Sequence, residues 1–521
     1  MGDASLGLDA GTRAIGHLHC PVGGAGMQTQ QPTISRVGRS ATATRRRSIP
    51  KTYGLPLVGP LAELLTDPLS FFVKSYVTRG PVFQVKVPTR KYTVLAGHEA
   101  NLFFLKEDQR LFEHAELYQN IARELDASHY MIATSGDRHA NLRRSSMPAF
   151  ATDVLDAATP RLLEEIGRRA RAWQPGTRLR VLDLMHELIG DVIVTALAGR
   201  ALGSHLRDAV TFARFSMGCG LGGYPVQFRY APHYQMARRR MFPLFREIVQ
   251  WHRDNPVEVA ERCGGGAGDG AGGGAGGANA WRAGGGNASR AGGAGGRAAD
   301  FIDQVLAVRD ENGQPLSDDN IVALAQTVYS NALLYAAPTM AFLLYSLLAA
   351  PEVMARCRQE IDETFGQGTP DLTQLRAAEY FGATLRESQR MHPIGLAAPR
   401  VAKETFTFAG YEIPRGERVL IALTACHYLP EIYPSPYSFE PERHMEPRNE
   451  SRATGVFAPF GYGAHSCLAA RLVDGMTRVV VAGLVRNAEL ELDRADYTIR
   501  KRVNPFPEPA GDLVVRVVGG R

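Results

Sequence analysis

The sequence FGYGAHSCLA, residues 460–469, sets two glycines, a basic residue and a cysteine at fixed offsets, and a helix-competent apolar run follows it. The pattern predicts a tight loop that presents the thiol of Cys467 at the beginning of a helix. Glycine accepts positive φ angles and lets a flat ligand approach the backbone closely. Backbone N–H groups and the positive end of the helix favour the thiolate, which is the form of cysteine that binds a metal.

A lone cysteine does not fit a structural zinc site, because zinc takes four ligands and no Cys-x-x-Cys pair lies nearby. One axial thiolate suits haem iron. The stretch resembles the haem-binding loop of the cytochrome P450 family of haem-thiolate monooxygenases, and the matching positions are Phe460, Gly461, Gly463, His465 and Cys467. The resemblance implies haem b as the cofactor, with Cys467 as the axial iron ligand, His465 at a haem propionate and Phe460 over the thiolate.

The loop departs from the family pattern at Ala469, where the family usually has glycine two residues after the cysteine. Alanine adds one methyl group where the helix and the porphyrin pass closely. We therefore expect a small local adjustment and no loss of haem.

A second segment, TLRESQRMHP at residues 384–393, places Glu387 and Arg390 three residues apart, on one face of a helix where they can pair. Taken alone, such a pair is usually a solvent-exposed ion pair that contributes little. The segment resembles the Glu-x-x-Arg helix of the family. The resemblance implies a buried network that Arg443 completes, with the structural role of holding the chain ahead of the haem loop.

A third segment, GDRHANLRR at residues 136–144, places His139 and Arg143 four residues apart, so both side chains can face one anion. Without the resemblance this would be an ordinary basic helix face. The family places such a pair at a haem propionate, and Arg400 matches a third propionate donor. Arginine suits this role because its planar guanidinium presents a fork of N–H groups to a carboxylate.

Length and composition fit this interpretation. A chain of 521 residues with 45% hydrophobic content can bury a large core, although the length alone would suggest several domains. The resemblance implies one mainly α unit with a smaller β region, the cytochrome P450 fold, over residues 49–521. Residues 82–87 and 92–95 have the pattern of a β-hairpin, and helical patterns dominate from about residue 153.

The formal charge of +6 is modest, and no dense Lys/Arg run with interleaved aromatics suggests a nucleic-acid partner. The six cysteines lack the spacing of a disulfide framework, which favours a reducing compartment.

Two segments are expected outside the regular fold. Residues 1–48 form a disordered or targeting tail, and they contain no apolar run near the roughly 20 residues that span a bilayer. Their arginine-rich, acid-poor composition permits an organelle transit peptide, so the expected location is cytoplasmic, or organellar if the tail is such a signal. Peripheral membrane contact stays open. Residues 263–299 are a flexible Gly/Ala-rich insertion between two helices.

A long helix is predicted from about residue 320 to residue 349, with an N-cap at Ser317 and a stop before Pro351. The resemblance implies that this helix crosses the distal face of the haem. There the family usually has an acid and an alcohol that deliver protons to the reacting oxygen. Counting back from Pro351 puts Leu334 at the acid position and Tyr335 at the alcohol position, so the usual pair is not expected here.

Pro338 lies inside the same helix, where proline removes a hydrogen bond and bends the helix at a cost of about 3 kcal/mol. Thr339 follows it and is the candidate catalytic hydroxyl if the kink shifts the helix. The alternative is a side chain that bonds back to its own helix.

Three functions stay open at this level. The first is a monooxygenase that hydroxylates or epoxidises a hydrophobic substrate with electrons from a reductase or a ferredoxin. The second is a haem-thiolate isomerase, dehydratase or peroxygenase that acts on a peroxide without a reductase. The third is a haem-binding sensor without enzymatic activity. Residues 92–118 have some likeness to the sterol demethylases, which makes a sterol or another lipid the expected substrate.

Overall fold

The computed structural model describes residues 48–52, 60–87, 90–128, 130–221, 224–257, 299–366 and 368–521. Apart from residues 48 and 299, the predicted tail at 1–48 and the predicted insertion at 263–299 lie outside these ranges, so both stay predictions. The described residues belong to one compact unit.

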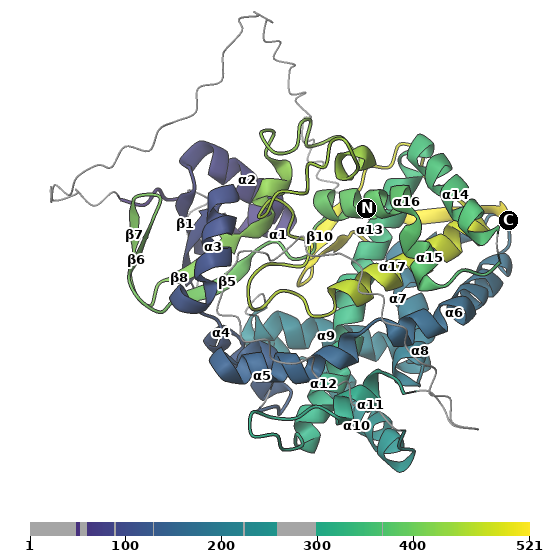
Figure 1. Cartoon of the computed structure of the whole chain (residues 1–521), viewed down its shortest axis with the longest axis horizontal. Coiled ribbons are helices and arrows are strands. Elements are labelled where there is room, and N and C mark those ends of the chain that lie inside the picture. Colours follow the sequence, from purple (N-terminus) through teal and green to yellow (C-terminus); the bar gives the residue numbers. More distant parts are fainter. Residues whose placement is uncertain are drawn as a thin grey trace, which may run out of the picture. The chain divides into compact units, whose positions relative to one another are not determined.

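Helices make up most of the described chain (Figure 1). The α-helices are α1 (Leu61–Thr66), α2 (Pro68–Arg79), α3 (His98–Leu111), α4 (Ala115–Glu124), α5 (Gly136–Ser146), α6 (Asp153–Arg171), α7 (Val181–Glu187), α8 (Val194–Ala198), α9 (Leu206–Gly220), α10 (Pro232–Asp254), α11 (Phe301–Leu306), α12 (Asp318–Asn331), α13 (Ala337–Leu348), α14 (Pro351–Phe365), α15 (Leu372–Ala377), α16 (Glu379–Met391) and α17 (Ala470–Asn487). The π-helical turns are η3 (Leu188–Ile193) and η6 (Ala332–Ala336). The short 3₁₀ turns are η1 (Met131–Ala133), η2 (Met147–Phe150), η4 (Gly203–His205), η5 (Val226–Tyr230), η7 (Leu423–Tyr428) and η8 (Pro441–His444).

The strands form a smaller β region. They are β1 (Val82–Val87), β2 (Arg90–Ala96), β3 (Phe112–Glu113), β4 (Arg178–Arg180), β5 (Ala398–Ala402), β6 (Phe406–Phe408), β7 (Tyr411–Ile413), β8 (Arg418–Ala422), β9 (Ala488–Leu492), β10 (Lys501–Val503), β11 (Pro507–Pro509) and β12 (Val514–Gly520). One sheet has the order β1-β2-β8-β5-β3, in which β2 and β8 run parallel. The antiparallel pairing of β1 with β2 confirms the predicted hairpin, and the mainly helical fold with a smaller β region is also confirmed.

The predicted long helix is present as α12, η6 and α13, which run continuously over Asp318–Leu348. Its 31 residues have a mean hydropathy of 1.4 in the most apolar window and would be long enough to cross a membrane, but 78% of that window is buried inside the protein. It packs against α7, α16 and α17 and is therefore a central core helix.

Pro338 is accommodated by the π-helical turn that precedes it. The amide of Ala337 donates to the carbonyl of Ala332, five residues back, and α13 begins at Ala337. Pro338 thus lies inside the continuous helix over Asp318–Leu348, as the sequence predicted. The local irregularity that accompanies it is the π-helical turn η6, directly before α13.

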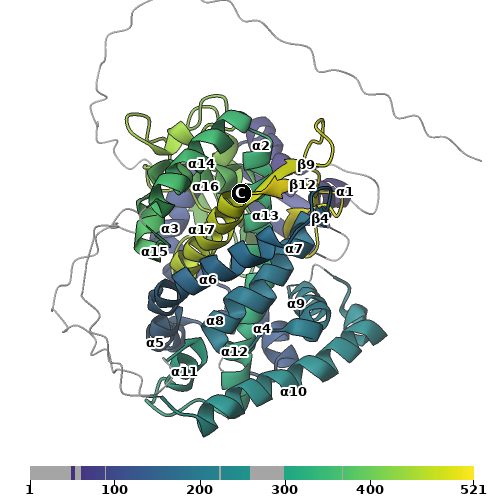
Figure 2. The ribbon, with the colours of Figure 1, turned by 90° about the vertical axis from the view of Figure 1, so that its right-hand side faces the viewer.

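Several segments that are distant in sequence meet around the chain that leads into α17. In Figure 1 the five-stranded sheet and α3 lie on the left, and α13 to α17 lie on the right. Helix α17 packs across α6, and Figure 2 shows the two side by side. The loop before α17, which carries Cys467, lies between the sheet side and the helical side.

Candidate active site

The loop that carries Cys467 is closed by its own backbone. The amide of Cys467 donates to the carbonyl of Phe460 at 2.9 Å, and the hydroxyl of Tyr462 donates to the carbonyl of Phe457 at 2.7 Å. Gly461 and Gly463 have φ angles of +73° and +76°, in the left-handed region that favours glycine. The turn thus requires both predicted glycines, and Cys467 stands just before α17.

The thiol of Cys467 is accessible and yet enclosed. Its residue is exposed, but burial raises the pKa of the thiol. The backbone N–H of Ala469 and the positive charge of Arg143 act in the opposite direction and lower that pKa. Two neighbouring groups therefore favour the thiolate, which is the form that binds iron.

Ala469, the departure from the family pattern, fits its position without strain. Its φ and ψ angles are −88° and 11°, outside the left-handed region. Any L-residue adopts such a conformation, so the backbone does not require glycine here.

Three imidazoles converge beside this loop, from His114, His139 and His465. The ring centroid of His465 lies 3.3 Å from that of His114 and 3.9 Å from that of His139. Burial and the charge of Arg400 lower the pKa of His114 to about 3. Burial and the charge of Arg143 lower the pKa of His139 to about 4, and the pKa of His465 is lowered as well. The three imidazoles are therefore neutral and lie beside two guanidinium groups. We call these five side chains the basic cluster: His114, His139, His465, Arg143 and Arg400.

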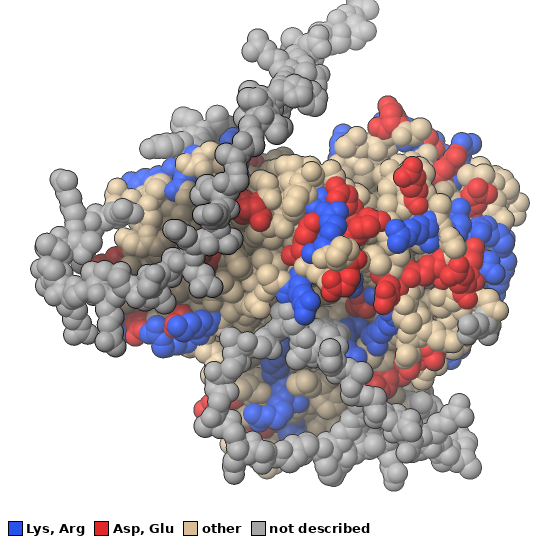
Figure 3. Space-filling model, turned by 45° about the horizontal axis from the view of Figure 1, so that its top comes forward, with Lys and Arg blue, Asp and Glu red and all other residues tan. Residues whose placement is uncertain are grey.

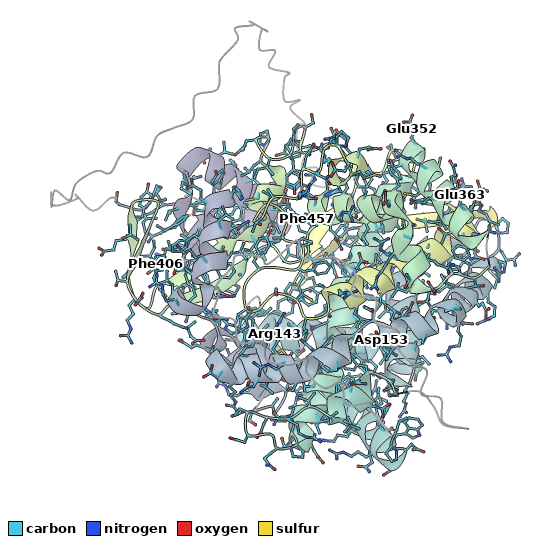
Figure 4. All side chains as sticks on the ribbon, viewed as in Figure 1. Arg143, Asp153, Glu352, Glu363, Phe406 and Phe457 are labelled. Carbon is cyan, nitrogen blue, oxygen red and sulfur yellow. The ribbon has the colours of Figure 1, made fainter. Side chains whose placement is uncertain are left out.

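The basic cluster fits the carboxylates of a haem. Nε2 of His114 is buried and has no hydrogen-bond partner. The guanidinium of Arg143 reaches the loop itself, where it donates to the carbonyl of Ser466 at 2.8 Å; Figure 4 labels Arg143 on α5, below the loop. An anion would accept a hydrogen bond from the unpartnered His114 nitrogen and compensate the positive charges of Arg143 and Arg400. The residues present therefore fit haem, with Cys467 for the iron and the basic cluster for the propionates.

His114 is a functional candidate that the sequence did not reveal. It follows β3 directly and belongs to no spaced motif. The stretch that contains it, residues 92–118, was noted only for its likeness to the sterol demethylases, and the position of His114 beside His465 depends on the tertiary fold.

Arg400, the predicted third propionate donor, has a partner that the sequence did not indicate. Its Nε donates to Oδ1 of Asp108 at 2.9 Å, and both side chains are buried. Its guanidinium lies over the ring of Phe104, 4.9 Å from the centroid. Arg400 thus belongs to the basic cluster and is also ion-paired.

The structure brings Glu387, Arg390 and Arg443 together. Arg390 donates to the two carboxylate oxygens of Glu387 at 2.8 Å each, and Nε of Arg443 donates to Oε1 at 3.2 Å. His444, which the sequence did not single out, lies 3.0 Å from Oε2 through its Nε2. All four side chains are fully buried. Burial raises the pKa of Glu387, but the hydrogen bonds from Arg390 and His444 outweigh it and lower the pKa to about 2.

This network is connected to the haem loop through His427. Arg390 donates to the carbonyl of His427 at 2.6 Å, and the imidazole Nε2 of His427 accepts the amide of Ala458 at 3.0 Å. Arg443 donates to the carbonyl of Ser435 at 2.7 Å. The three predicted residues therefore hold the segment that leads into the loop. Toward the surface the network continues into further ion pairs, and Figure 3 shows acidic and basic side chains in mixed patches.

The distal helix places the remaining candidates differently. Thr339, the predicted catalytic hydroxyl, donates to the carbonyl of Tyr335 at 2.8 Å, which is a bond to its own helix. Leu334 is buried and apolar. Burial raises the pKa of Tyr335 strongly, and Tyr118, Tyr130 and Cys467 add to the effect, so the phenol is neutral. Residues 331–339, all described, contain no acid.

Comparison with known proteins agrees with this site. The family model for cytochrome P450 matches residues 288–505. The chain is 26% identical over 443 residues to cyclooctat-9-en-7-ol 5-monooxygenase of Streptomyces melanosporofaciens, covering 82% of this chain and 86% of the relative. It is 23% identical over 446 residues to sterol 14alpha-demethylase of Mycolicibacterium vanbaalenii, covering 83% and 89%. The fold matches that of the retinoic acid-bound cyanobacterial CYP120A1 with a TM-score of 0.72 at 19% identity, over 92% of this chain and 100% of the other.

The loop around Cys467, the basic cluster beside it and these similarities lead to one conclusion. The chain belongs to the cytochrome P450 family and is a haem-thiolate monooxygenase.

Proposed function

We propose that the enzyme hydroxylates or epoxidises a sterol or another lipid-like molecule that carries an oxygen function. The observation that supports this is a group of aromatic side chains around Tyr335 of the predicted distal helix, a residue that interacts electrostatically with Cys467. We call this group the aromatic wall, and its members are Tyr118, Tyr130, Tyr335 and Phe506. Large apolar walls with a few hydroxyl groups suit a hydrophobic ligand that needs one or two polar contacts for orientation.

The aromatic wall is assembled from separate parts of the chain. Tyr118 is on α4, Tyr130 precedes η1, Tyr335 is in η6, and Phe506 lies between β10 and β11. The ring centroids of Tyr335 and Phe506 are 4.4 Å apart. Tyr118 and Tyr130 are 8% and 6% exposed, so their hydroxyl groups are largely withdrawn from bulk water. Thr327 lies within 3.4 Å of the Tyr130 hydroxyl and donates to it.

The relatives point in the same direction. Three relatives are named for action on cyclooctat-9-en-7-ol, a sterol and obtusifoliol. Another relative, from Caenorhabditis elegans, is a 3-ketosteroid oxygenase, at 28% identity over 222 residues. These names support the substrate class and leave the individual molecule open.

We assign Cys467, the basic cluster and the aromatic wall different roles in the reaction, according to their positions. Cys467 would bind the iron as thiolate, with the amide of Ala469 donating to its sulfur, and the basic cluster would orient the porphyrin through its carboxylates. Bound haem with a thiolate ligand supplies the oxidising chemistry. The aromatic wall excludes bulk water from the substrate. Since residues 331–339 provide no acid, we propose that protons arrive from water or from a hydroxyl of the substrate.

The expected partner is an electron donor, either a reductase or a ferredoxin. The location of the protein stays a proposal as well: cytoplasmic, or organellar if residues 1–48 act as a transit peptide, with peripheral contact to a membrane as a further possibility. Import of a fusion of residues 1–48 to a fluorescent protein distinguishes the two locations.

A panel of sterols, other lipids and their deoxygenated analogues, titrated into the haem-loaded enzyme, tests the substrate class. We expect changes in the haem absorbance with oxygen-bearing lipids, and oxygenated product when reduced nicotinamide and a reductase are supplied. Tyr118→Phe should weaken binding of the oxygen-bearing lipid about fivefold and leave its deoxygenated analogue unaffected, since a hydrogen bond contributes about 1 kcal/mol. Tyr437→Phe, at a tyrosine that is 70% exposed, is the matched control.

Two results would contradict the proposal. Equal affinity for the oxygen-bearing lipid and its analogue would remove the role of the tyrosines. Product formed from a lipid peroxide without an electron donor would favour the isomerase or peroxygenase alternative.

A further inference from the structure

Asp108 is a buried acid beside the basic cluster. It lies in the last turn of α3, near the C-terminal end of that helix, and is 5% exposed. Its charge raises the pKa of His139, which places it within electrostatic reach of the group of side chains that fits the propionates. Neither the family pattern nor the chemistry described above uses it.

The carboxylate of Asp108 joins three parts of the site. Its Oδ1 accepts Nε of Arg400 at 2.9 Å, and its Oδ2 lies 3.5 Å from Nη2 of the same guanidinium. Oδ2 also accepts the backbone N–H of Ala464 in the haem loop at 3.3 Å. One side chain on α3 therefore ties β5 to the loop that carries the cysteine.

The haem loop passes directly against this carboxylate. A β-carbon built on Gly463 would lie 2.4 Å from Oδ2 of Asp108, closer than real contacts allow. Gly463 is therefore required twice, by its positive φ angle and by the proximity of Asp108. This contact is specific to the pair and would be lost with a longer side chain at either position.

Arg400 is oriented from several sides. Phe104, fully buried four residues before Asp108 on the same helix, lies under the guanidinium. Asp108 holds the Nε edge, and Nη1 donates to the carbonyl of Pro399 at 3.0 Å. A guanidinium has five N–H donors, so those that remain can reach a second carboxylate.

We propose that Asp108 is a positioning residue for the haem: it orients Arg400 and the loop toward a propionate, and its negative charge lowers the reduction potential of the bound iron. A negative charge in a buried site favours the more positive, oxidised iron by Coulomb attraction. It also offsets one of the two arginine charges of the basic cluster. Asp108 would thus control both how firmly the haem is held and how readily it accepts the first electron.

The experiment compares haem-loaded Asp108→Asn with the parent enzyme by two measurements. The first is the rate at which haem transfers to an excess of apomyoglobin. We expect it to increase about 10- to 100-fold, as for the loss of a hydrogen bond to a charged group. The second is the midpoint reduction potential, which we expect to rise because a negative charge has been removed.

Glu107→Gln is the matched control, since it removes the same charge one residue away. Glu107 pairs with Arg110 at 2.7 Å, and among the described residues neither Arg400 nor the haem loop forms a hydrogen bond or ion pair with it. Its potential and haem-transfer rate should stay at the parent values. Asp108→Glu, which keeps the charge but not the geometry, should keep the potential near the parent value while haem transfer is faster.

A purely structural role for Asp108 predicts a different result. Folded, haem-loaded Asp108→Asn with an unchanged potential would overturn the proposal, whatever its rate of haem transfer. A potential that rises equally in Glu107→Gln would also overturn it, because the effect would then be one of general surface charge.

A second pair of variants decides the matter if Asp108→Asn yields too little folded protein. Arg400→Gln should lower the potential, and adding Asp108→Asn should return it toward the parent value, because the double variant leaves no unpaired buried charge. Equal potentials for Arg400→Gln and the double variant would overturn the proposal.

Discussion

The two sides of the site differ in how their polar groups are arranged. The proximal side lies around Cys467 and Glu387, and the distal side is the helix around Tyr335. On the proximal side, Glu387, Arg390 and Arg443 are fully buried and paired at 2.8 to 3.2 Å. On the distal side, residues 331–339 have no charged group, and the hydroxyl of Thr339 is used by its own helix. The proximal side carries the cysteine ligand of the iron, whereas we propose that the distal side contacts the substrate.

The difference has a physical reason. A buried ion pair compensates for its desolvation only when its geometry is close to ideal, so few sequences can provide it. An apolar wall is satisfied by many combinations of side chains of suitable volume. More departures from a family pattern are therefore expected on the distal side, where this chain has Leu334, Tyr335 and Pro338, than on the proximal side, where it has Ala469.

The largest effect is expected from replacing the sulfur atom of Cys467 on the proximal side. Cys467→Ser should abolish the red-shifted absorption of the reduced carbon monoxide complex, the band after which the family is named, because that band requires a thiolate ligand. Difference spectra of the reduced protein with carbon monoxide check this. Persistence of the band in the variant would show that another residue ligates the iron.

The buried network comes next in expected size. Glu387→Ala removes the carboxylate that pairs with buried Arg390, which costs about 3–5 kcal/mol, whereas Arg443 keeps its pairs with Glu440 and Glu450. We expect little soluble, haem-loaded protein. Glu363→Ala, at an exposed glutamate on α14, is the control and should behave like the parent. A fully loaded Glu387→Ala enzyme that is merely slower would assign Glu387 to chemistry and break the contrast between the two sides.

Acid should destabilise the proximal side by protonating Glu387. The pKa of Glu387 falls from an ordinary 4.5 to about 2 in the folded protein. Its stabilising contribution is therefore complete above about pH 4.5 and is lost as the pH falls toward 2, and a depression of this size corresponds to about 3 kcal/mol. Loss of haem absorbance and of helical circular dichroism, followed together between pH 6 and 2, measures it. A haem-loss midpoint that is equally low in a folded Glu387→Gln variant would contradict the assignment.

The parts that could be predicted from the sequence share one property: they are local. Gly461, Gly463 and Cys467 lie within one turn, and Glu387 and Arg390 lie on one helical face, so spacing alone suggests their geometry. The ion pair of Asp108 with Arg400 joins residues 292 positions apart, and no spacing indicates it.

Other features were missed for related reasons. His114 joins the basic cluster only because β3 and the haem loop meet in the fold. In the π-helical turn η6, the amide of Ala337 donates to the carbonyl of Ala332, five residues back. Neither residue propensity nor apolar periodicity predicts such a turn.

Smaller effects are expected on the distal side. General acid–base assistance typically contributes about 10²–10⁴ in rate. Without an acid–alcohol pair we expect poor coupling, with hydrogen peroxide released for part of the reduced nicotinamide consumed. Thr339→Ala should leave that ratio unchanged, because its hydroxyl donates to Tyr335 of its own helix.

Measurement of nicotinamide, product and hydrogen peroxide together gives the coupling ratio. Ser346→Ala, whose hydroxyl likewise donates to the carbonyl four residues back, is the matched control. A marked rise in peroxide for Thr339→Ala alone would mean that this hydroxyl reaches the reacting oxygen, and the distal side would then resemble the rest of the family.

The smallest effect is expected from deleting residues 264–296, which lie outside the described residues. The chain on either side is already held together, because Nε2 of His252 on α10 lies 2.9 Å from Oδ2 of Asp300, the N-cap of α11. The free energy of loop closure changes by only about 0.6 kcal/mol for each doubling of loop length. Haem content should therefore stay at the parent value and the thermal midpoint should move by only a few degrees. A Gly/Ser segment of the original length is the control, and loss of haem in the deletion but not in this control would show that the insertion length supports the site.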